Sequence, residues 1–302
     1  MTEGLRGRRL RARHRRQAER HLDPLPADAR GGGGVWAVGL VRDEVDIIET
    51  TVVNLLSQGV ERVVVADNLS TDGTSEVLAR LARTGPVTVL ADRLVPYYQA
   101  EKMTLLARAA ARGGAGWVLP FDADEVWLAP GTTVAAWLAH CEAAVVQAPV
   151  YNHVPTVDDD PGDPDPVTRL RWRKAEPNRL HKVVFRAHAR ARLDQGNHGV
   201  HRRGPRAQGL EVRHFPYRSE EQFVRKVRQG SAALADSELP VESGKHWRGL
   251  GGNDDDALHG AWRSLLETHN VPLEWWVPRH GLVEDAVDLR SLSPPGGDGA
   301  GA

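Results

Sequence analysis

The sequence predicts an α/β fold in which a mainly parallel sheet is covered by helices on both faces. The first observation is that short apolar runs alternate with segments whose apolar residues recur at helical spacing. The second is that two of these runs end in carboxylates, in Val63–Thr74 (VVVADNLSTDGT) and Trp117–Trp127 (WVLPFDADEVW). Alternating strands and helices are typical of βαβ units, whose ligands bind at the carboxyl edge of the sheet.

The first half of the chain contains the clearest periodic segments. The predicted strands are Val35–Val41, Arg62–Ala66, Val87–Ala91, Trp117–Phe121 and Ala144–Val150. The predicted helices are Asp43–Gln58, Thr74–Arg83 and Gln99–Arg112. In the first helix Val45, Ile48, Val52 and Leu55 share one face, and Gly59 is well placed to end it.

The second half has weaker signals. An acidic, proline-rich loop, Asp158–Pro166, precedes two β-like runs, His181–Arg186 and Leu210–Phe215. Ser219 opens a helix with Gln222 three residues later, which is a capping-box arrangement. A last helix is predicted over Ala257–His269.

These patterns divide the chain into five parts. We expect a disordered tail at 1–34, a regular α/β half at 35–150, a mixed β/helical half at 151–235, a helical extension at 236–288 and a disordered tail at 289–302. Eight arginines crowd the first twenty residues, and such a composition buries little apolar surface. This segment could contact an anionic membrane surface or nucleic acid, or be a solvated tail or a misassigned start.

Bulk composition limits the class of protein. The 39 basic and 40 acidic residues nearly cancel, so we expect no nucleic-acid partner. The single cysteine, Cys141, excludes an internal disulfide framework and a multi-cysteine zinc site. No run approaches the roughly 18 apolar residues of a membrane span, and no apolar signal region opens the chain. We expect a cytoplasmic enzyme.

Asp122 and Asp124 are the strongest candidate for a ligand site. In an extended chain both side chains point to the same side. Two carboxylates that close repel each other unless a cation lies between them. Hard divalent cations take oxygen ligands, so the pair is suited to Mg²⁺ or Mn²⁺ carrying a diphosphate. A solvated acidic turn is the alternative.

The order of motifs resembles a glycosyltransferase of the family 2 type with the GT-A fold. The similarity rests on VGLVRDEVDIIETTVVNLLSQGV, VVVADNLSTDGT, an alanine-rich helix and GWVLPFDADEVW. It covers Val35–Val150 well and extends, through HKVVFRA, GNHGV and HFPYRSEEQFVRK, to about Leu234. Within that family the chain is most similar to the soluble bacterial branch, in which R/K-x-E follows the first strand.

The resemblance implies a nucleoside diphosphate sugar donor (UDP-, GDP- or dTDP-linked), a hydroxyl acceptor and an inverting reaction. It also implies that residues 35–150 are the nucleotide-sugar-binding half and residues 151–235 the acceptor-binding half. It implies that Asp67 binds the nucleobase, that Asp122 contacts the ribose or a metal-bound water, and that Asp124 ligates Mn²⁺ or Mg²⁺. Lys102 could neutralise the diphosphate, contact the base or be a solvated surface residue. Processive relatives carry Q-x-x-R-W, which is absent here, so we expect transfer of a single sugar.

Two histidines and two carboxylates complete the list of candidates. GT-A enzymes often add a histidine to the metal shell, and His214 is favoured over His198 because it ends a strand-like run; a structural or acceptor-binding role is the alternative for each. Asp194 and Glu211 are weak candidates for the general base.

Two other functions fit parts of the pattern. DADEV also matches the D-x-D-x-[TV] motif of haloacid-dehalogenase-type phosphatases, in which Asp122 would be the nucleophile and Asp124 a general acid. In that fold the motif ends the first strand, whereas three strands precede it here. The third possibility is a catalytically inactive protein that binds a nucleotide-sugar.

Overall fold

The structure is a computed structural model that describes residues 5–235, 249–269 and 281–287. Its larger sheet has seven strands in the order β10-β6-β9-β4-β1-β2-β3. Their bounds are β1 Val35–Val41, β2 Arg62–Asp67, β3 Val87–Ala91, β4 Trp117–Phe121, β6 Val145–Ala148, β9 Lys182–Arg186 and β10 Arg206–Gln208. Strands β3, β2, β1 and β4 are parallel, which confirms the predicted mainly parallel α/β sheet.

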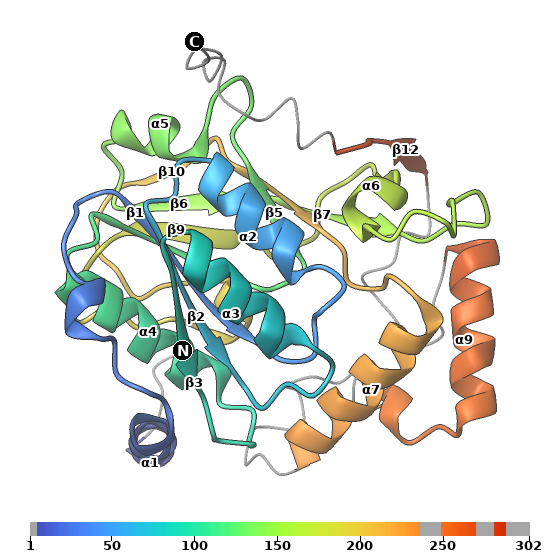
Figure 1. The fold of residues 1–302 in the computed structure, drawn as a ribbon, viewed down its shortest axis with the longest axis horizontal. Coiled ribbons are helices and arrows are strands. Elements are labelled where there is room, and N and C mark those ends of the chain that lie inside the picture. The colour runs from blue at the N-terminus through green and yellow to red at the C-terminus, as the bar shows by residue number, and fades with distance from the viewer. Residues whose placement is uncertain (1–4, 236–248, 270–280, 288–302) are drawn as a thin grey trace.

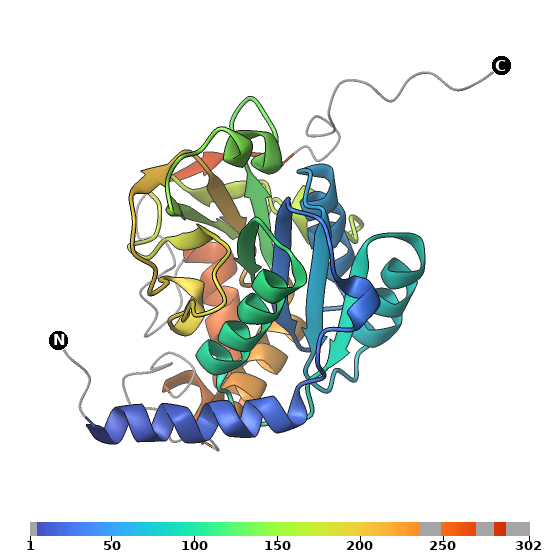
Figure 2. The ribbon, with the colours of Figure 1, turned by 90° about the vertical axis from the view of Figure 1, so that its left-hand side faces the viewer.

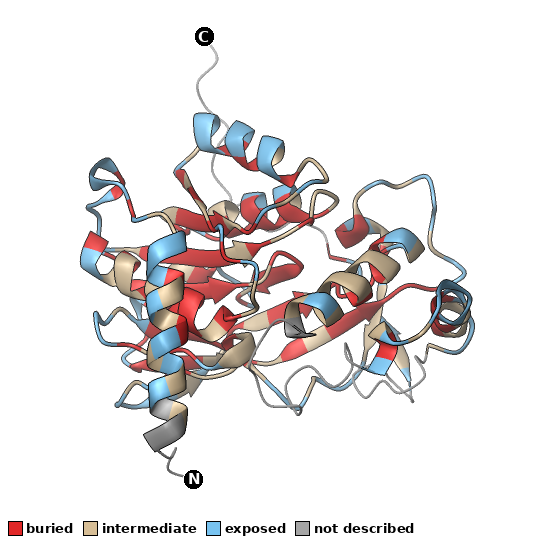
Figure 3. Cartoon of the chain, turned by 90° about the horizontal axis from the view of Figure 1, so that it is seen from below, coloured by how far each residue is buried: buried red, intermediate tan, exposed pale blue. Residues whose placement is uncertain are grey.

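Helices cover both faces of this sheet. Helices α2 (Ile48–Ser57) and α3 (Thr74–Thr84) lie on one face, and α4 (Gln99–Gly113) lies on the other (Figures 1 and 2). Buried residues fill the layers between them (Figure 3). The four strands and three helices predicted for residues 35–121 all form, although α2 begins at Ile48 rather than Asp43.

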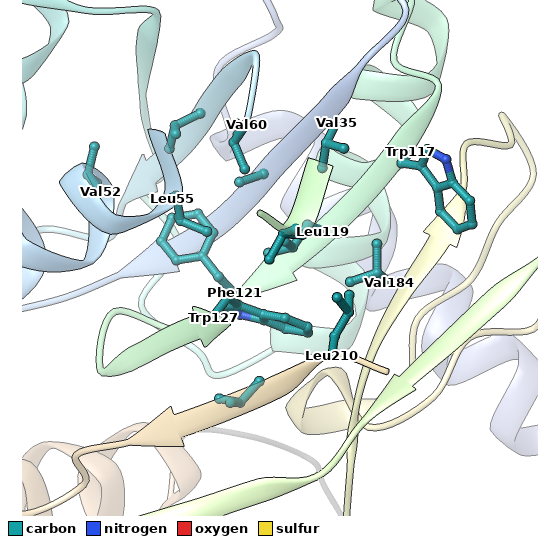
Figure 4. Close-up of a cluster of buried hydrophobic side chains, with 14 of the residues drawn as sticks. Val35, Val52, Leu55, Val60, Trp117, Leu119, Phe121, Trp127, Val184 and Leu210 are labelled. Atoms are coloured by element: carbon teal, nitrogen blue, oxygen red, sulfur yellow. The ribbon is translucent and has the colours of Figure 1, made fainter. Parts of the chain in front are cut away.

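The core under α2 is built from aliphatic and aromatic side chains. Val52 and Leu55 pack in the same cluster as Leu119, Phe121 and Trp127 (Figure 4). Gly39 in β1 permits this packing, because a Cβ atom there would lie 2.5 Å from the Phe121 ring. The end of β4 is thereby fixed against β1 immediately before Asp122.

A second sheet extends the molecule in the order β12-β8-β7-β11-β5. Its strands are β5 Glu125–Leu128, β7 Val150–Val154, β8 Trp172–Lys174, β11 Glu211–His214 and β12 Leu282–Glu284. The single strand predicted over Ala144–Val150 is wrong, because β6 and β7 belong to different sheets. Pro149 separates them, and a proline has no N–H group with which to continue the ladder of β6.

Register brings the polar ends of the strands to one edge. Val41 pairs with Asp67, and Gly39 pairs with Phe121. The chain therefore leaves β1, β2 and β4 on the same side of the sheet. The residues between β4 and β5, which include Asp122 and Asp124, lie where the two sheets meet.

The N-terminal segment is helical, which corrects the prediction of a disordered tail at 1–34. Residues expected to be disordered form α1 (Leu5–His21), which packs against α4 and runs along one side of the molecule (Figure 2). Ala18 is fully buried, and the ring of His14 stacks on Tyr98 with 3.9 Å between centroids. Arginine favours helices, and a narrow uncharged stripe suffices to dock a helix on an existing surface. Composition alone does not reveal this.

The C-terminal part is not purely helical. Helix α7 (Glu220–Ala235) packs against α9 (Asp255–Thr268) through Phe223 and Trp262, while β12 pairs with β8. The short helices are α5 Val134–Ala139, α6 Pro166–Arg169 and the 3₁₀ turns Ala27–Ala29 and Gln195–Asn197. The tail predicted at 289–302 lies outside the described residues. Within the described ranges no helix has the length and apolar character to cross a membrane.

Candidate active site

A cleft of about 460 Å³ opens at the carboxyl edge of the larger sheet, within the usual range for small-ligand sites. Its walls come from both sheets and from α7. The lining side chains with chemical character are Arg42, Asp43, Glu44, Asn68, Tyr97, Gln99, Asp122, Asp124, Lys174, Asn178, Arg179, Lys182, His198, His214, Gln222, Arg225, Lys226 and Gln229. Four predicted site residues, Asp122, Asp124, His198 and His214, are thus brought together.

Asp124 is the centre of a buried charge cluster. Its carboxylate forms an ion pair with Lys226, lies 3.8 Å from Nη1 of Arg218 and lies 3.4 Å from Nε2 of His214. Burial opposes ionisation, but Lys226, His214 and Arg218 outweigh it and hold the pKa of Asp124 well below its usual value. Asp124 is therefore an anion that is already compensated by protein cations.

Asp122 belongs to a different cluster. One oxygen forms an ion pair with Lys182, and the other accepts hydrogen bonds from Asn197 (3.0 Å) and Gln99 (3.2 Å). Lys182 also lies 2.6 Å from the fully buried carboxylate of Glu125. Burial, reinforced by the charge of Asp122, raises the pKa of Glu125 to about 8 despite Lys182. Each of the two aspartates thus has its own protein cation, and a divalent cation shared between them stays a prediction.

The donor set around Asp124 nevertheless fits a divalent metal. Nδ1 of His214 lies 2.9 Å from Oδ1 of Asn152, so in the assigned orientation of that amide Nδ1 carries the proton. Nε2 is the nitrogen that faces the Asp124 carboxylate, and it would have to be deprotonated to coordinate a metal there. One imidazole and one carboxylate are ligands that Mn²⁺ and Mg²⁺ accept. Among the described residues no group of three or more such side chains forms a complete metal site, so a bound ligand and water would supply the remaining oxygens.

His198 lines the cleft without joining the Asp124 cluster. Its Nδ1 lies 3.0 Å from the carbonyl oxygen of His181, to which it donates. Burial, with the charge of Lys182, lowers the pKa of His198 to about 4. The ring is a neutral imidazole at physiological pH. Of the two predicted histidine ligands, only His214 is placed beside Asp124.

Two residues predicted to bind the nucleotide lie elsewhere. Lys102 is buried and pairs with Asp92 at 2.7 Å and with the carbonyl of Leu94 at 2.6 Å, so neither the phosphate-binding nor the surface interpretation describes it. Asp67 accepts hydrogen bonds from the backbone N–H of Ser70 and the hydroxyl of Ser75. Its neighbour Asn68 lines the cleft instead.

The two weak candidates for the base are also outside the cleft lining. Asp194 is half exposed and accepts a hydrogen bond from His201 at 2.9 Å. Glu211 pairs with Arg213 at 2.8 Å, at the opposite end of β11 from His214. The strand predicted over Leu210–Phe215 forms as β11, but alternation along a strand does not say which end faces the ligand. Asp194 lies outside the strands, directly before the 3₁₀ turn Gln195–Asn197.

Sequence reasoning missed the cations that surround the aspartates. Lys182 begins β9, whereas Arg218 lies just before α7 and Lys226 lies in the second turn of that helix. Arg218 is fully buried; burial opposes its charge, but Glu44, Asp46 and Asp124 raise its pKa. HKVVFRA and HFPYRSEEQFVRK contain these residues, but each segment also carries a further cation, Arg186 or Arg225, and nothing local distinguishes them.

Comparison with solved structures finds distant likenesses, of which three are described. The structure of S. aureus TarS 1–349 in complex with UDP has a TM-score of 0.38 and 12% identity, covering 77% of this chain and 71% of that one. HddC from Yersinia pseudotuberculosis has a TM-score of 0.36 and 10% identity, covering 63% and 96%. Mycobacterium tuberculosis glucosyl-3-phosphoglycerate synthase, solved with Mn²⁺, UDP-glucose and phosphoglyceric acid, has a TM-score of 0.29 and 20% identity, covering 41% and 46%.

At such TM-scores these likenesses carry no conclusion about this chain. No protein-family model and no curated protein matches the sequence. The function has to be inferred from the geometry of the cleft.

Proposed function

We propose that this protein is a metal-dependent glycosyltransferase of the family 2 type that transfers one hexose from a nucleoside diphosphate sugar to a hydroxyl group. The observation that carries the proposal is the meeting of Asp124, His214 and Lys226 in a cleft at the carboxyl edge of a parallel sheet. Such an edge is where nucleotides bind in open α/β folds. The DADE segment and the motif order of residues 35–150 support the same activity.

The residues have separate tasks in this proposal. Asn68, Tyr97 and Gln99 line the part of the cleft formed by the larger sheet and would face the nucleoside. Asp124 and His214 would hold Mn²⁺ or Mg²⁺, which when bound withdraws charge from a departing diphosphate. Lys226, next to Asp124, presents a positive charge on the same side. Burial opposes the charge of Lys226, but Asp124 and Glu44 raise its pKa and keep it protonated.

The reaction follows from the two substrates. The acceptor oxygen forms a bond to the anomeric carbon, and the bond from that carbon to the diphosphate oxygen breaks. The nucleoside diphosphate leaves with the electron pair, and the hydroxyl proton passes to a base. A single displacement of this kind inverts the anomeric configuration.

The phosphatase alternative is weaker. A nucleophilic aspartate needs an oxygen that is free to approach phosphorus. Both oxygens of Asp122 accept hydrogen bonds or pair with Lys182. These contacts suit a carboxylate that positions neighbouring groups.

One set of assays separates the three functions. UDP, GDP and dTDP are titrated by calorimetry with Mn²⁺ or Mg²⁺, and the corresponding sugar nucleotides are tested for consumption. We expect one nucleotide to bind in a metal-dependent way and its sugar derivative to be consumed. Hydrolysis of a phosphate monoester without nucleotide binding would establish the phosphatase. Nucleotide-sugar binding without turnover under any acceptor condition would establish the inactive protein.

A further inference from the structure

Some of the positively charged side chains that line the cleft have no carboxylate partner among the described residues. Of its six cationic lining residues, four have carboxylate partners: Arg42 with Asp43, Lys182 with Asp122 and Glu125, Arg225 with Glu221, and Lys226 with Asp124. The other two are Lys174 and Arg179. Within the described residues neither side chain has a hydrogen-bond or ion-pair partner.

These two cations lie on one wall of the cleft. Lys174 ends β8, and Arg179 follows in the loop that leads to β9. The loop is anchored at Asn178, whose backbone N–H donates to the carbonyl of Val150 at 2.8 Å. The side chain of Asn178 donates to Oδ1 of Asn152 at 2.7 Å, the same oxygen that His214 contacts. Asn152 therefore links this wall to His214, the side chain that faces Asp124.

Lys174 and the nucleotide edge also belong to different sheets. Asn68, Tyr97 and Gln99 belong to the connections of the larger sheet, whereas Lys174 belongs to the smaller sheet. Asp124 lies in the turn between β4 and β5, where one sheet passes into the other. A donor whose nucleoside occupies the first edge and whose diphosphate reaches Asp124 leaves the second wall for the acceptor.

We propose that Lys174 and Arg179 bind an anionic group of the acceptor, either a phosphate or a carboxylate. This inference rests on the proposed glycosyltransferase function, since it assigns the second substrate of the same cleft. A guanidinium binds phosphate and carboxylate oxygens through two parallel hydrogen bonds, and an ammonium adds a compact charge beside it. The acceptor is then a molecule that carries both a hydroxyl and a negative charge.

Small probes and a charge-removing variant test the proposal. Glycerol phosphate, glycerate and glycerol share hydroxyl groups and differ in having a phosphate, a carboxylate or no charge. Each is titrated by calorimetry into the full chain, first alone and then with saturating UDP and Mn²⁺. The variant is Lys174→Met with Arg179→Gln, and the matched control is Arg190→Gln, an exposed arginine outside the cleft lining.

We expect one anionic probe to bind the wild type and glycerol not to bind. The double variant should weaken that binding about tenfold or more, because charged hydrogen bonds are lost. Its affinity for UDP should match the wild type, and Arg190→Gln should change neither. Whichever anion binds more tightly distinguishes phosphate from carboxylate.

Three results would overturn the inference. One is that neither anion binds the wild type, and the second is that binding survives in the double variant. The third is that the variant loses affinity for UDP, which would assign both cations to the donor. Failure of the proposed function is seen separately, because none of UDP, GDP and dTDP would then bind the wild type, whereas the titrations without nucleotide would still report on Lys174 and Arg179.

Discussion

Nε2 of His214 lies 3.4 Å from Oδ1 of Asp124. The two residues meet because β11 pairs antiparallel with β5, with His214 opposite Glu125, and because the N–H of Phe215 donates to the carbonyl of Asp124 at 2.9 Å. A carboxylate after β4 and an imidazole from the second half of the chain are thereby fixed by backbone pairing. Most of the predictions below depend on this contact or on the charges around it.

Asp124→Asn should abolish metal-dependent consumption of the donor, lowering the turnover number on the order of 10²-fold or more. The fold should persist, since Lys226 keeps Glu44 and Arg218 keeps Glu44 and Asp46 as partners. The measurement is donor consumption as a function of Mn²⁺ concentration. Asp67→Asn is the matched control, because that carboxylate is absent from the cleft lining. Unchanged turnover in Asp124→Asn would remove Asp124 from the metal site.

The two cleft histidines should behave differently. His214→Ala should raise the Mn²⁺ concentration needed for half-maximal activity, because an imidazole ligand is lost. His198→Ala should leave that concentration unchanged, since Nδ1 of His198 donates to a backbone carbonyl. Metal titrations of both variants give the comparison. Equal metal dependence in both would mean that oxygen ligands alone hold the metal.

Lys182→Met should destabilise the protein by about 3 kcal/mol, because it removes the buried cation that pairs with Asp122 and contacts Glu125. Adding Asp122→Asn should restore part of the loss, since an amide carries no charge to compensate. The measurement is urea unfolding of the wild type, the single variants and the double variant. Strictly additive effects would show that the two side chains do not interact energetically.

Stability should fall as the pH drops from 6.5 towards 4 because of His153. Burial lowers the pKa of His153 from 6.5 to about 4, and its Nδ1 lies 2.7 Å from the carbonyl of Leu170. Between these pH values the unfolded chain binds a proton that the folded protein excludes. A difference of about 2.5 pKa units corresponds to roughly 3 kcal/mol. The loss is complete near pH 4 and absent above 6.5.

Replacing His153 with phenylalanine is the control for this pH dependence. The aromatic ring keeps the stacking on Phe215 and removes the titrating group. Urea unfolding between pH 4 and pH 7.5 should then show a smaller slope than in the wild type, although the variant is less stable at neutral pH. An unchanged slope would mean that other groups cause the acid sensitivity.

Helix α1 should bind anionic membrane surfaces. One side of the helix packs through His14 and Ala18, and Arg9, Arg16 and Arg20 are exposed. Each basic residue near an anionic bilayer contributes about 1 kcal/mol, so changing all three to glutamine should weaken binding roughly 100-fold. Flotation with phosphatidylserine vesicles measures this, with phosphatidylcholine vesicles as the control. Equal binding to both vesicles, or preference for a nucleic-acid competitor, would contradict it.

Local patterns in the sequence determined the elements of the larger sheet. The apolar runs of β1 to β4 and the periodic faces of α2 to α4 were predicted because each has enough residues to show its period. The carboxylates at the end of β4 were recognised as a site because a buried strand delivers them to a sheet edge. Asp122 and Asp124 do line the cleft.

Only the tertiary structure decided how these carboxylates are compensated. Lys182 comes from β9, whereas Arg218 and Lys226 come from the residues before α7 and from α7 itself, all distant in sequence from the aspartates that they contact. The pairing of β11 with β5 placed His214 beside Asp124, and the packing of α4 buried Lys102 against Asp92. The docking of α1 was likewise decided by the surface of α4. Periodicity reports which face of an element is buried, but the identity of the neighbour depends on strand order and register, which no local pattern encodes.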